Sequence, residues 1–194
     1  MNFVELKNLP ILDLQSELES LIEKKVVDFN KNTTQICLNT VNGKENDYEF
    51  GRGSLYYDWE NKYVNDDGEV VVPPKEIVYQ ESDFNVLCTQ FVDTGFETVY
   101  NALQKMFDLG RVRIMKSKPK TCLSWHADDH PRVHFPMQTQ EGCYMVIDDT
   151  SKHLEECKWY YTNTILPHTA FNGSSKDRIH LVATIVGEKN ASFN

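Results

Sequence analysis

The sequence predicts an α+β fold that is mainly β, with an antiparallel barrel or sandwich in the C-terminal half and helices outside it. Two observations predict this fold: two helical patterns occur before residue 110, and the pattern changes to short strand-like segments from there on. Many short strands at close spacing are typical of antiparallel barrels and sandwiches. Because 194 residues suit one domain, we expect a single domain over 1–194, with helices and outer strands in 1–110 and the β core in 111–186.

The first predicted helix follows Pro10, a residue that suits the first turn of a helix. Apolar residues then recur at three- and four-residue steps from Ile11 to Val26. Residues 30–69 are rich in Asn, Asp, Gly and Tyr and lack a sustained period, which predicts turns with short strands. We expect further strands at 69–72 and within 78–91.

The second predicted helix begins at Thr94, which forms a capping-box pair with Glu97. Its apolar stripe consists of Phe96, Val99, Tyr100, Leu103, Met106 and Phe107. Gly110 is expected in the left-handed cap that ends this helix. The strands predicted after it are 111–116, 132–138, 142–148, 157–162, 164–168 and 178–186.

The charge balance is acidic, with 20 Lys and Arg against 29 Asp and Glu and a formal net charge of −9. Such a balance argues against nucleic-acid partners, which require a basic surface. The charge is unevenly distributed. Residues 1–110 carry 9 basic and 20 acidic side chains, whereas residues 111–194 carry 11 basic and 9 acidic ones. All six histidines also follow residue 110, so we expect the chemistry to lie in the second part.

The sequence also restricts the compartment. It begins without the charged leader and apolar core of a secretory signal, and no stretch approaches the roughly twenty apolar residues of a membrane span. The five cysteines are odd in number and contain no CxxC pair, which disfavours a disulfide framework or a zinc knuckle. We therefore expect a soluble, cytoplasmic protein without a membrane partner; the sequence leaves its oligomeric state open.

A His-x-Asp pair opens the candidate site. In an extended segment, His126 and Asp128 point to the same face because strand side chains alternate. Imidazole and carboxylate are two of the three ligand positions that hold non-haem Fe(II) on one face and leave the others open. Taken alone, the pattern also occurs in polar turns. His130 offers an alternative ligand in the same loop.

His168 and Arg178 extend this candidate site. His168 lies 42 residues after His126, and a barrel can bring such distant strand ends together to complete the metal face. Arg178 and His180 share one face of an otherwise apolar strand. A guanidinium that points into a barrel requires an anion, and its planar fork suits a carboxylate. The alternative is an arginine that points to water at a strand end.

A third element is the strand RVHFPMQT, which begins at residue 132. Arg132 and His134 share one face, and Val133, Phe135 and Met137 share the other. Two donor side chains beside a metal would bind carboxylate oxygens. A half-buried strand with a polar outer face explains the same pattern.

Together these pieces resemble the aspartyl/asparaginyl β-hydroxylase branch of the 2-oxoglutarate- and Fe(II)-dependent oxygenases. The matching pieces are His126, the RVHFPMQT strand, the segment HTAFN that begins at His168, and Arg178 ten residues later. The resemblance covers residues 111–186. It implies a double-stranded β-helix, which is a jelly-roll or cupin-like barrel, with iron at one end.

The resemblance also implies roles. His126, Asp128 and His168 would bind Fe(II); Arg178 would bind the distal carboxylate of 2-oxoglutarate, with Arg132 and His134 near its other end. The reaction would couple decarboxylation of 2-oxoglutarate by O2 to hydroxylation of an amino acid, or of an Asp, Asn or Pro residue in a peptide. Asp128 completes a full triad, as in bacterial free-amino-acid hydroxylases of this branch such as proline hydroxylases. Ser117 and Ser124 are candidates for a further serine that helps to hold the cosubstrate.

Other functions stay open at this point. One is a non-catalytic β-barrel module that uses Arg132 and Arg178 for a small carboxylate ligand. Another is a zinc hydrolase with two His and one Asp. The aromatic segment 48–63 has two interpretations, an edge strand with aromatic packing, which we favour, or a cover over the pocket. The sequence does not identify the substrate.

Overall fold

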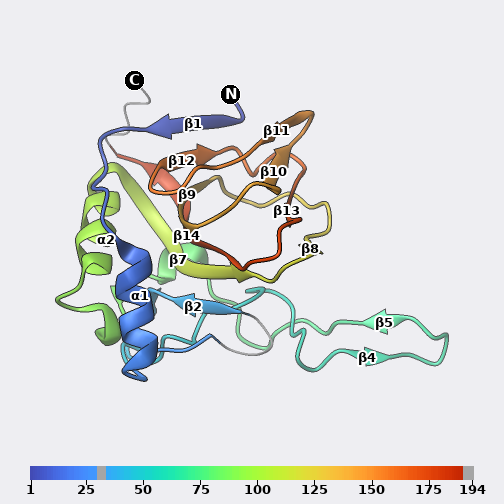
Figure 1. Cartoon of the computed structure of the whole chain (residues 1–194). Coiled ribbons are helices and arrows are strands. Elements are labelled where there is room, and N and C mark those ends of the chain that lie inside the picture. Colours follow the sequence, from blue (N-terminus) through green and yellow to red (C-terminus); the bar gives the residue numbers. More distant parts are fainter. Residues whose placement is uncertain (30–33, 190–194) are drawn as a thin grey trace.

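The computed structural model describes residues 1–29 and 34–189 (Figure 1). Across these residues, the main body is a six-stranded sheet and a four-stranded sheet, both antiparallel. The larger sheet has the order β1 (Phe3–Leu6), β12 (Trp159–Thr162), β9 (Arg132–Gln138), β14 (Arg178–Glu188), β7 (Phe107–Ser117) and β2 (Gln35–Cys37). The smaller sheet has the order β11 (Thr150–Lys152), β10 (Cys143–Ile147), β13 (His168–Asn172) and β8 (Thr121–Cys122).

From β7 onward the chain passes back and forth between the sheets. Strands β7, β9, β12 and β14 belong to the larger sheet, and β8, β10 with β11, and β13 belong to the smaller one. This alternation is the connectivity of a jelly roll, so the predicted mainly-β, cupin-like double-stranded β-helix is confirmed. Strands β1 and β2, from the N-terminal part, extend the larger sheet at its two edges.

Helices α1 (Leu14–Glu23) and α2 (Gly95–Met106) cover one face of the larger sheet (Figure 1). That face carries alternate apolar residues of β9 and β14, as predicted. Those residues, which are Val133, Phe135, Met137, Ile179, Leu181, Ala183 and Ile185, belong to the main hydrophobic core with Leu14, Leu18, Phe96 and Leu103 of the helices. Burying this many aliphatic and aromatic side chains is the main force that holds helices and sheet together.

Capping side chains determine where the two helices begin. Helix α1 begins after Asp13, not directly behind Pro10, because the Asp13 side chain accepts a hydrogen bond from the Ser16 amide. Thr94 caps α2 by accepting from the Glu97 amide, while the Glu97 carboxylate accepts from the Asp93 amide one residue before the cap.

Gly110 does not cap α2, and this prediction was wrong. The helix ends at Met106 and the chain continues directly into β7, which contains Gly110. A Cβ at this position would lie 2.7 Å from the Glu81 carboxylate and 3.2 Å from Thr184. The glycine therefore allows the close approach of Glu81 to the strand.

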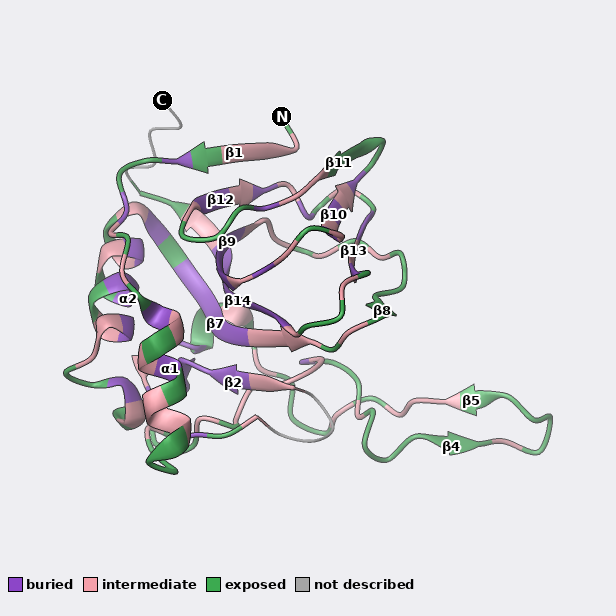
Figure 2. Ribbon diagram, viewed as in Figure 1, coloured by how far each residue is buried: buried purple, intermediate pink, exposed green. Residues whose placement is uncertain are grey.

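Other strand predictions were shifted or too long. The strand expected at 164–168 lies at 168–172, so His168 begins a strand and does not end one. Within 78–91 the chain forms the 3-10 turns η1 (Glu81–Asp83) and η2 (Thr89–Phe91), with β6 (Val86–Leu87) paired to β3 (Asn39–Thr40). The strand expected at 69–72 is one arm of a short hairpin, β4 (Tyr63–Val64) and β5 (Val70–Val71), which projects from the body and is largely exposed (Figures 1 and 2).

The inner face of the larger sheet is polar. The side chains that alternate with the core residues on β7, β9 and β14 face the smaller sheet, and nearly all are buried. The charged residues and histidines among them are Arg111, Arg113, Arg132, His134, Arg178 and His180. A jelly-roll interior with this many cations and histidines points to a ligand site inside the barrel. Within the described residues, no helix is both long and apolar enough to cross a membrane.

Candidate metal centre

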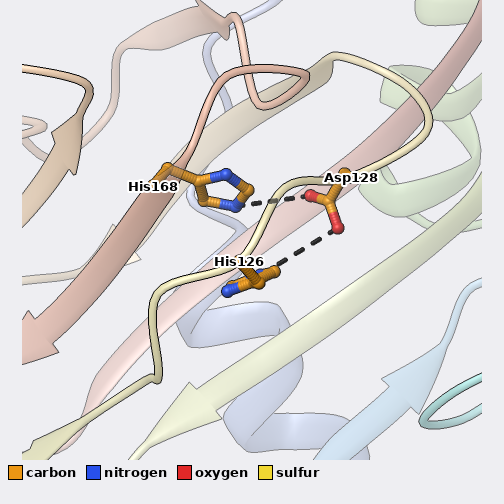
Figure 3. A group of neighbouring side chains, drawn as sticks. All are labelled: His126, Asp128 and His168. Carbon is orange, nitrogen blue, oxygen red and sulfur yellow. Dashed lines mark ion pairs between the residues drawn. The ribbon is translucent and has the colours of Figure 1, made fainter.

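His126, Asp128 and His168 meet at one end of the barrel (Figure 3). His126 follows β8 in an extended loop and pairs with the start of β13. The His126 amide donates to the His168 carbonyl at 3.1 Å, and the His168 amide donates back at 2.8 Å. The Asp128 amide donates to the Thr164 carbonyl, which fixes the same loop two residues later. One potential ligand atom from each of the three side chains lies within 4.8 Å of the others.

Both histidine rings are oriented in the same way. Nδ1 of His126 lies 2.8 Å from the Ser124 carbonyl, and Nδ1 of His168 lies 3.0 Å from the Leu166 carbonyl. A carbonyl oxygen only accepts, so Nδ1 is the donor in each ring and Nε2 is the nitrogen left to face a metal. Such an outer hydrogen bond is the usual arrangement around metal-binding histidines.

Asp128 faces both Nε2 atoms. Its Oδ1 accepts from Nη2 of Arg132 at 2.6 Å and lies 4.0 Å from Nε2 of His126. Its Oδ2 is buried, lies 3.4 Å from Nε2 of His168, and makes no regular hydrogen bond to any described residue. Burial opposes ionisation, but His168 and the charge of Arg132 hold the pKa of Asp128 below its ordinary value. Two imidazole lone pairs and one carboxylate on a common side fit Fe(II).

An inner cavity of about 130 Å³ leads from His168 into the barrel. Arg178 lines this cavity and is 8% exposed, and its Nη2 is 3.1 Å from Nδ1 of His180. No carboxylate of the described residues lies within ion-pair distance of Arg178, and burial lowers its pKa to about 10. Ser117 lies directly opposite Arg178 on β7 and lines the same cavity.

His134 lines this cavity between Arg178 and the metal group. It is buried, and neither of its ring nitrogens has a hydrogen-bond partner in the described chain. Burial and the charges of Arg178 and Arg132 hold the pKa of His134 well below that of free histidine, so the ring is neutral at pH 7. A neutral imidazole with a free N–H can donate to a carboxylate oxygen.

An outer cavity of about 630 Å³ opens on the other side of the metal group. Asp128 and His126 form part of its wall, and Arg132 lines both cavities. The two halves of the aromatic segment 48–63 have different surroundings. Phe50 packs on Phe84, as expected for packing, whereas Tyr56, Tyr57 and Trp59 are 40% to 58% exposed and line the cavity. For the second half of segment 48–63, the preferred packing interpretation was therefore wrong.

The candidate site brings together the predicted metal ligands and the predicted cosubstrate-binding residues. His126, Asp128 and His168 form the triad, Arg132 contacts Asp128, and His134 and Arg178 line the inner cavity. His130 is half-buried and is not among the grouped ligand atoms. Sequence reasoning missed Arg111 and Arg113, which also line the outer cavity. Their i, i+2 spacing on β7 is the same signal that identified Arg132 and His134.

Several solved structures are similar to parts of this chain at low sequence identity. A solved oxidoreductase of the 2OG-Fe(II) oxygenase family from Burkholderia pseudomallei is 12% identical, with a TM-score of 0.43, and the match covers 56% of this chain and 64% of that one. A Pseudomonas putida prolyl-4-hydroxylase is 13% identical, with a TM-score of 0.33, and the match covers 54% of this chain and 67% of that one. A cupin domain from Bordetella pertussis is 18% identical, with a TM-score of 0.35, and the match covers 39% of this chain and 79% of that one.

These structural matches are partial: this chain spans less than two thirds of the length of three of the first four structures. A search of curated proteins gives no match. The family model of aspartyl/asparaginyl β-hydroxylase, by contrast, matches residues 13–187, which include both helices, the whole triad and all strands of the two sheets except β1 and the last residue of β14. The chain therefore belongs to the aspartyl/asparaginyl β-hydroxylase family.

Proposed function

We propose that this protein is a non-haem Fe(II) dioxygenase that couples decarboxylation of 2-oxoglutarate to hydroxylation of an amino acid, or of an Asp, Asn or Pro residue in a peptide. The observation that carries the proposal is the group His126, Asp128 and His168, whose ligand atoms lie within 4.8 Å of one another at the mouth of a cavity that ends in Arg178. When bound, Fe(II) with 2-oxoglutarate and O2 supplies the oxidative decarboxylation to succinate and carbon dioxide and the hydroxylation of a C–H bond.

The chain's own residues prepare the metal face. The carbonyls of Ser124 and Leu166 hold the two imidazoles so that each Nε2 is directed toward Asp128. Arg132 occupies Oδ1 of Asp128 and leaves Oδ2 available as a ligand. Because these groups are fixed before any ion arrives, little rearrangement is needed on binding.

The inner cavity suits 2-oxoglutarate. Arg178 provides a guanidinium fork for the distal carboxylate, and Ser117 stands opposite it on the neighbouring strand. His134 and Arg132 lie between that end and the triad, where the keto acid end would bind. Met145, Val182 and Ala170 give the cavity apolar walls, and a low-dielectric surrounding strengthens each of these polar contacts.

The experiment is anaerobic addition of Fe(II) and 2-oxoglutarate to the purified protein. We expect a weak visible charge-transfer band in the wild type and its loss in His126→Ala, Asp128→Ala and His168→Ala. His130→Ala is the matched control, because this histidine lies in the same loop but outside the triad.

Two results would contradict the proposal. The first is a wild-type protein that binds 2-oxoglutarate but gives no band, which favours a non-catalytic carboxylate-binding barrel. The second is succinate release at wild-type rates in any of the three triad variants.

A further inference from the structure

Four arginines project from the larger sheet into the barrel, and only some of them have a carboxylate partner. Arg111 forms an ion pair with Glu81 at 2.7 Å and also donates to the carbonyls of Gly51 and Gly53. Arg132 forms its pair with Asp128. For Arg113 and Arg178, the described residues include no carboxylate within ion-pair distance.

Arg113 is the more deeply buried of the two, at 3% exposed. Its Nη1 donates to Oε1 of Gln35 at 3.2 Å, and its Nε has no hydrogen-bond partner among residues 1–29 and 34–189. A buried guanidinium without a counter-charge is costly, and so are its unmade hydrogen bonds. An anionic ligand would remove both costs.

Arg113 and Arg178 cannot bind the same carboxylate. In the strand register Arg178 lies opposite Ser117, which is four residues from Arg113 along β7, or roughly 13 Å at the usual strand rise. The inner cavity contains Arg178 and not Arg113, and the outer cavity contains Arg113 and not Arg178. His126, Arg132 and Gln35 line both cavities, so the two unpaired arginines line different cavities that share these residues.

The rest of the outer cavity is consistent with an organic anion. Tyr56, Tyr57 and Trp59 give it an aromatic wall. Of its carboxylates, Glu81 is neutralised by Arg111 and Asp128 by Arg132, while Asp129 is exposed and accepts from Oη of Tyr56 at 3.3 Å. The outer cavity is therefore lined by both an unpaired cation and an aromatic surface.

We propose that Arg113, oriented by Gln35, binds the carboxylate of the substrate, and that Tyr56, Tyr57 and Trp59 contact an aromatic or apolar body. The substrate class is then a carboxylic acid with such a body, bound apart from 2-oxoglutarate. This assignment rests on the proposed function, since it names the substrate side of the same metal site. Arg113 acts as a specificity-determining residue.

The test measures binding of 3-phenylpropionate and of its neutral analogue 3-phenylpropionamide by calorimetry. The protein is loaded with Mn(II) and 2-oxoglutarate, so that the inner cavity is filled and no turnover occurs. We expect the acid to bind at least tenfold more tightly than the amide. Arg113→Gln should weaken binding of the acid at least tenfold, leave binding of the amide unchanged, and leave the affinity for 2-oxoglutarate unchanged.

Two further variants separate binding from folding. Arg113→Lys keeps the charge and should retain the preference for the acid, even if Arg113→Gln is poorly folded. Arg178→Gln removes the other unpaired guanidinium and should lose 2-oxoglutarate binding while its Mn(II) form still prefers the acid over the amide.

Equal binding of acid and amide, binding of neither, or wild-type affinity for the acid in Arg113→Gln would overturn the assignment. If the Fe(II) and 2-oxoglutarate band persists in such a case, only the substrate assignment fails. If the band is absent but the acid binds through Arg113, the anion site stands and the proposed oxygenase function fails.

Discussion

The same kind of hydrogen bond to a backbone carbonyl orients His126 and His168. In each case the ring donates Nδ1–H to the carbonyl two residues earlier, and Nε2 is left facing Asp128. The two residues pair across a single β-bridge, so the same local geometry presents both lone pairs to one point. Asp128 completes the group because Arg132 binds its other oxygen. Single side chains therefore determine where a metal can bind.

The substitution Arg178→Lys tests whether the guanidinium of Arg178 binds 2-oxoglutarate. A lysine retains the positive charge but replaces a bidentate fork by a point charge, and it cannot reproduce the contact to His180 with the same geometry. We expect the dissociation constant for 2-oxoglutarate to rise roughly 10- to 100-fold, which corresponds to about 1.4–2.7 kcal/mol. Titration of the charge-transfer band measures it. An unchanged constant would place the anchor elsewhere, with Arg132 as the next candidate.

At the scale of elements, alternation along strands was the most informative sequence signal. It put Val133 and Phe135 on one face of a strand and Arg132 and His134 on the other, because side chains of a strand alternate whatever its neighbours are. The structure shows which face is which, since the first pair lies in the core and the second lines the inner cavity. The double-stranded β-helix was implied only by the family resemblance. Periodicity says nothing about which strands pair, so the jelly-roll connectivity was not readable from the pattern itself.

The failures at this scale have a common cause. Gly110 was expected in a helix cap because it follows an amphipathic helix, but it lies in β7 where Glu81 needs space. Tyr56 and Trp59 were expected to pack, but they face a cavity whose other wall comes from β7 and the loop after β8. In each case a partner distant in sequence decides the outcome, and a local pattern does not contain that partner.

The ion pair between η1 and β7 predicts a pH-dependent stability. Burial opposes ionisation of Glu81, but hydrogen bonds and charge from Arg111 lower its pKa below the ordinary value. A lowered folded-state pKa means that the stabilisation is fully present above the unfolded pKa, near 4.5, and is lost as the pH falls through the folded value. We expect Glu81→Gln to cost about 3–5 kcal/mol at pH 7, because Arg111 is left buried and unpaired.

Urea unfolding of wild type and Glu81→Gln at pH 7 and at several values below 4.5 tests this linkage. The difference between the two free energies of unfolding should narrow as the pH falls, since protonated Glu81 also lacks a charge. A difference that stays constant across this range would show that Glu81 contributes through packing and not through its charge. Glu49→Gln, which removes an exposed carboxylate from its ion pair with the half-buried Arg52, is the control.

On the scale of the whole molecule, the net charge of −9 hides a cationic interior. The acidic excess lies in residues 1–110, whereas the barrel holds Arg113 and Arg178 without carboxylate partners in the described part of the chain. Burial lowers the pKa of Arg113 to about 9, which reflects the cost of keeping this charge away from water. The ligand-free fold is thus less stable than its core alone would allow, and anionic ligands should stabilise it.

This arrangement predicts opposite effects of one substitution on the free and the liganded protein. Mn(II) with 2-oxoglutarate at about 100 times its dissociation constant should stabilise the wild type by about 2.7 kcal/mol, or raise its Tm by roughly 5–10 °C. Arg178→Met removes an unpaired buried cation, so its ligand-free Tm should exceed that of the wild type, while the 2-oxoglutarate-dependent rise should vanish. Scanning calorimetry with Mn(II) alone, and then with 2-oxoglutarate, separates the two effects. A lower ligand-free Tm together with an intact 2-oxoglutarate response would mean that Arg178 stabilises the barrel structurally and that the dicarboxylate is held by other groups.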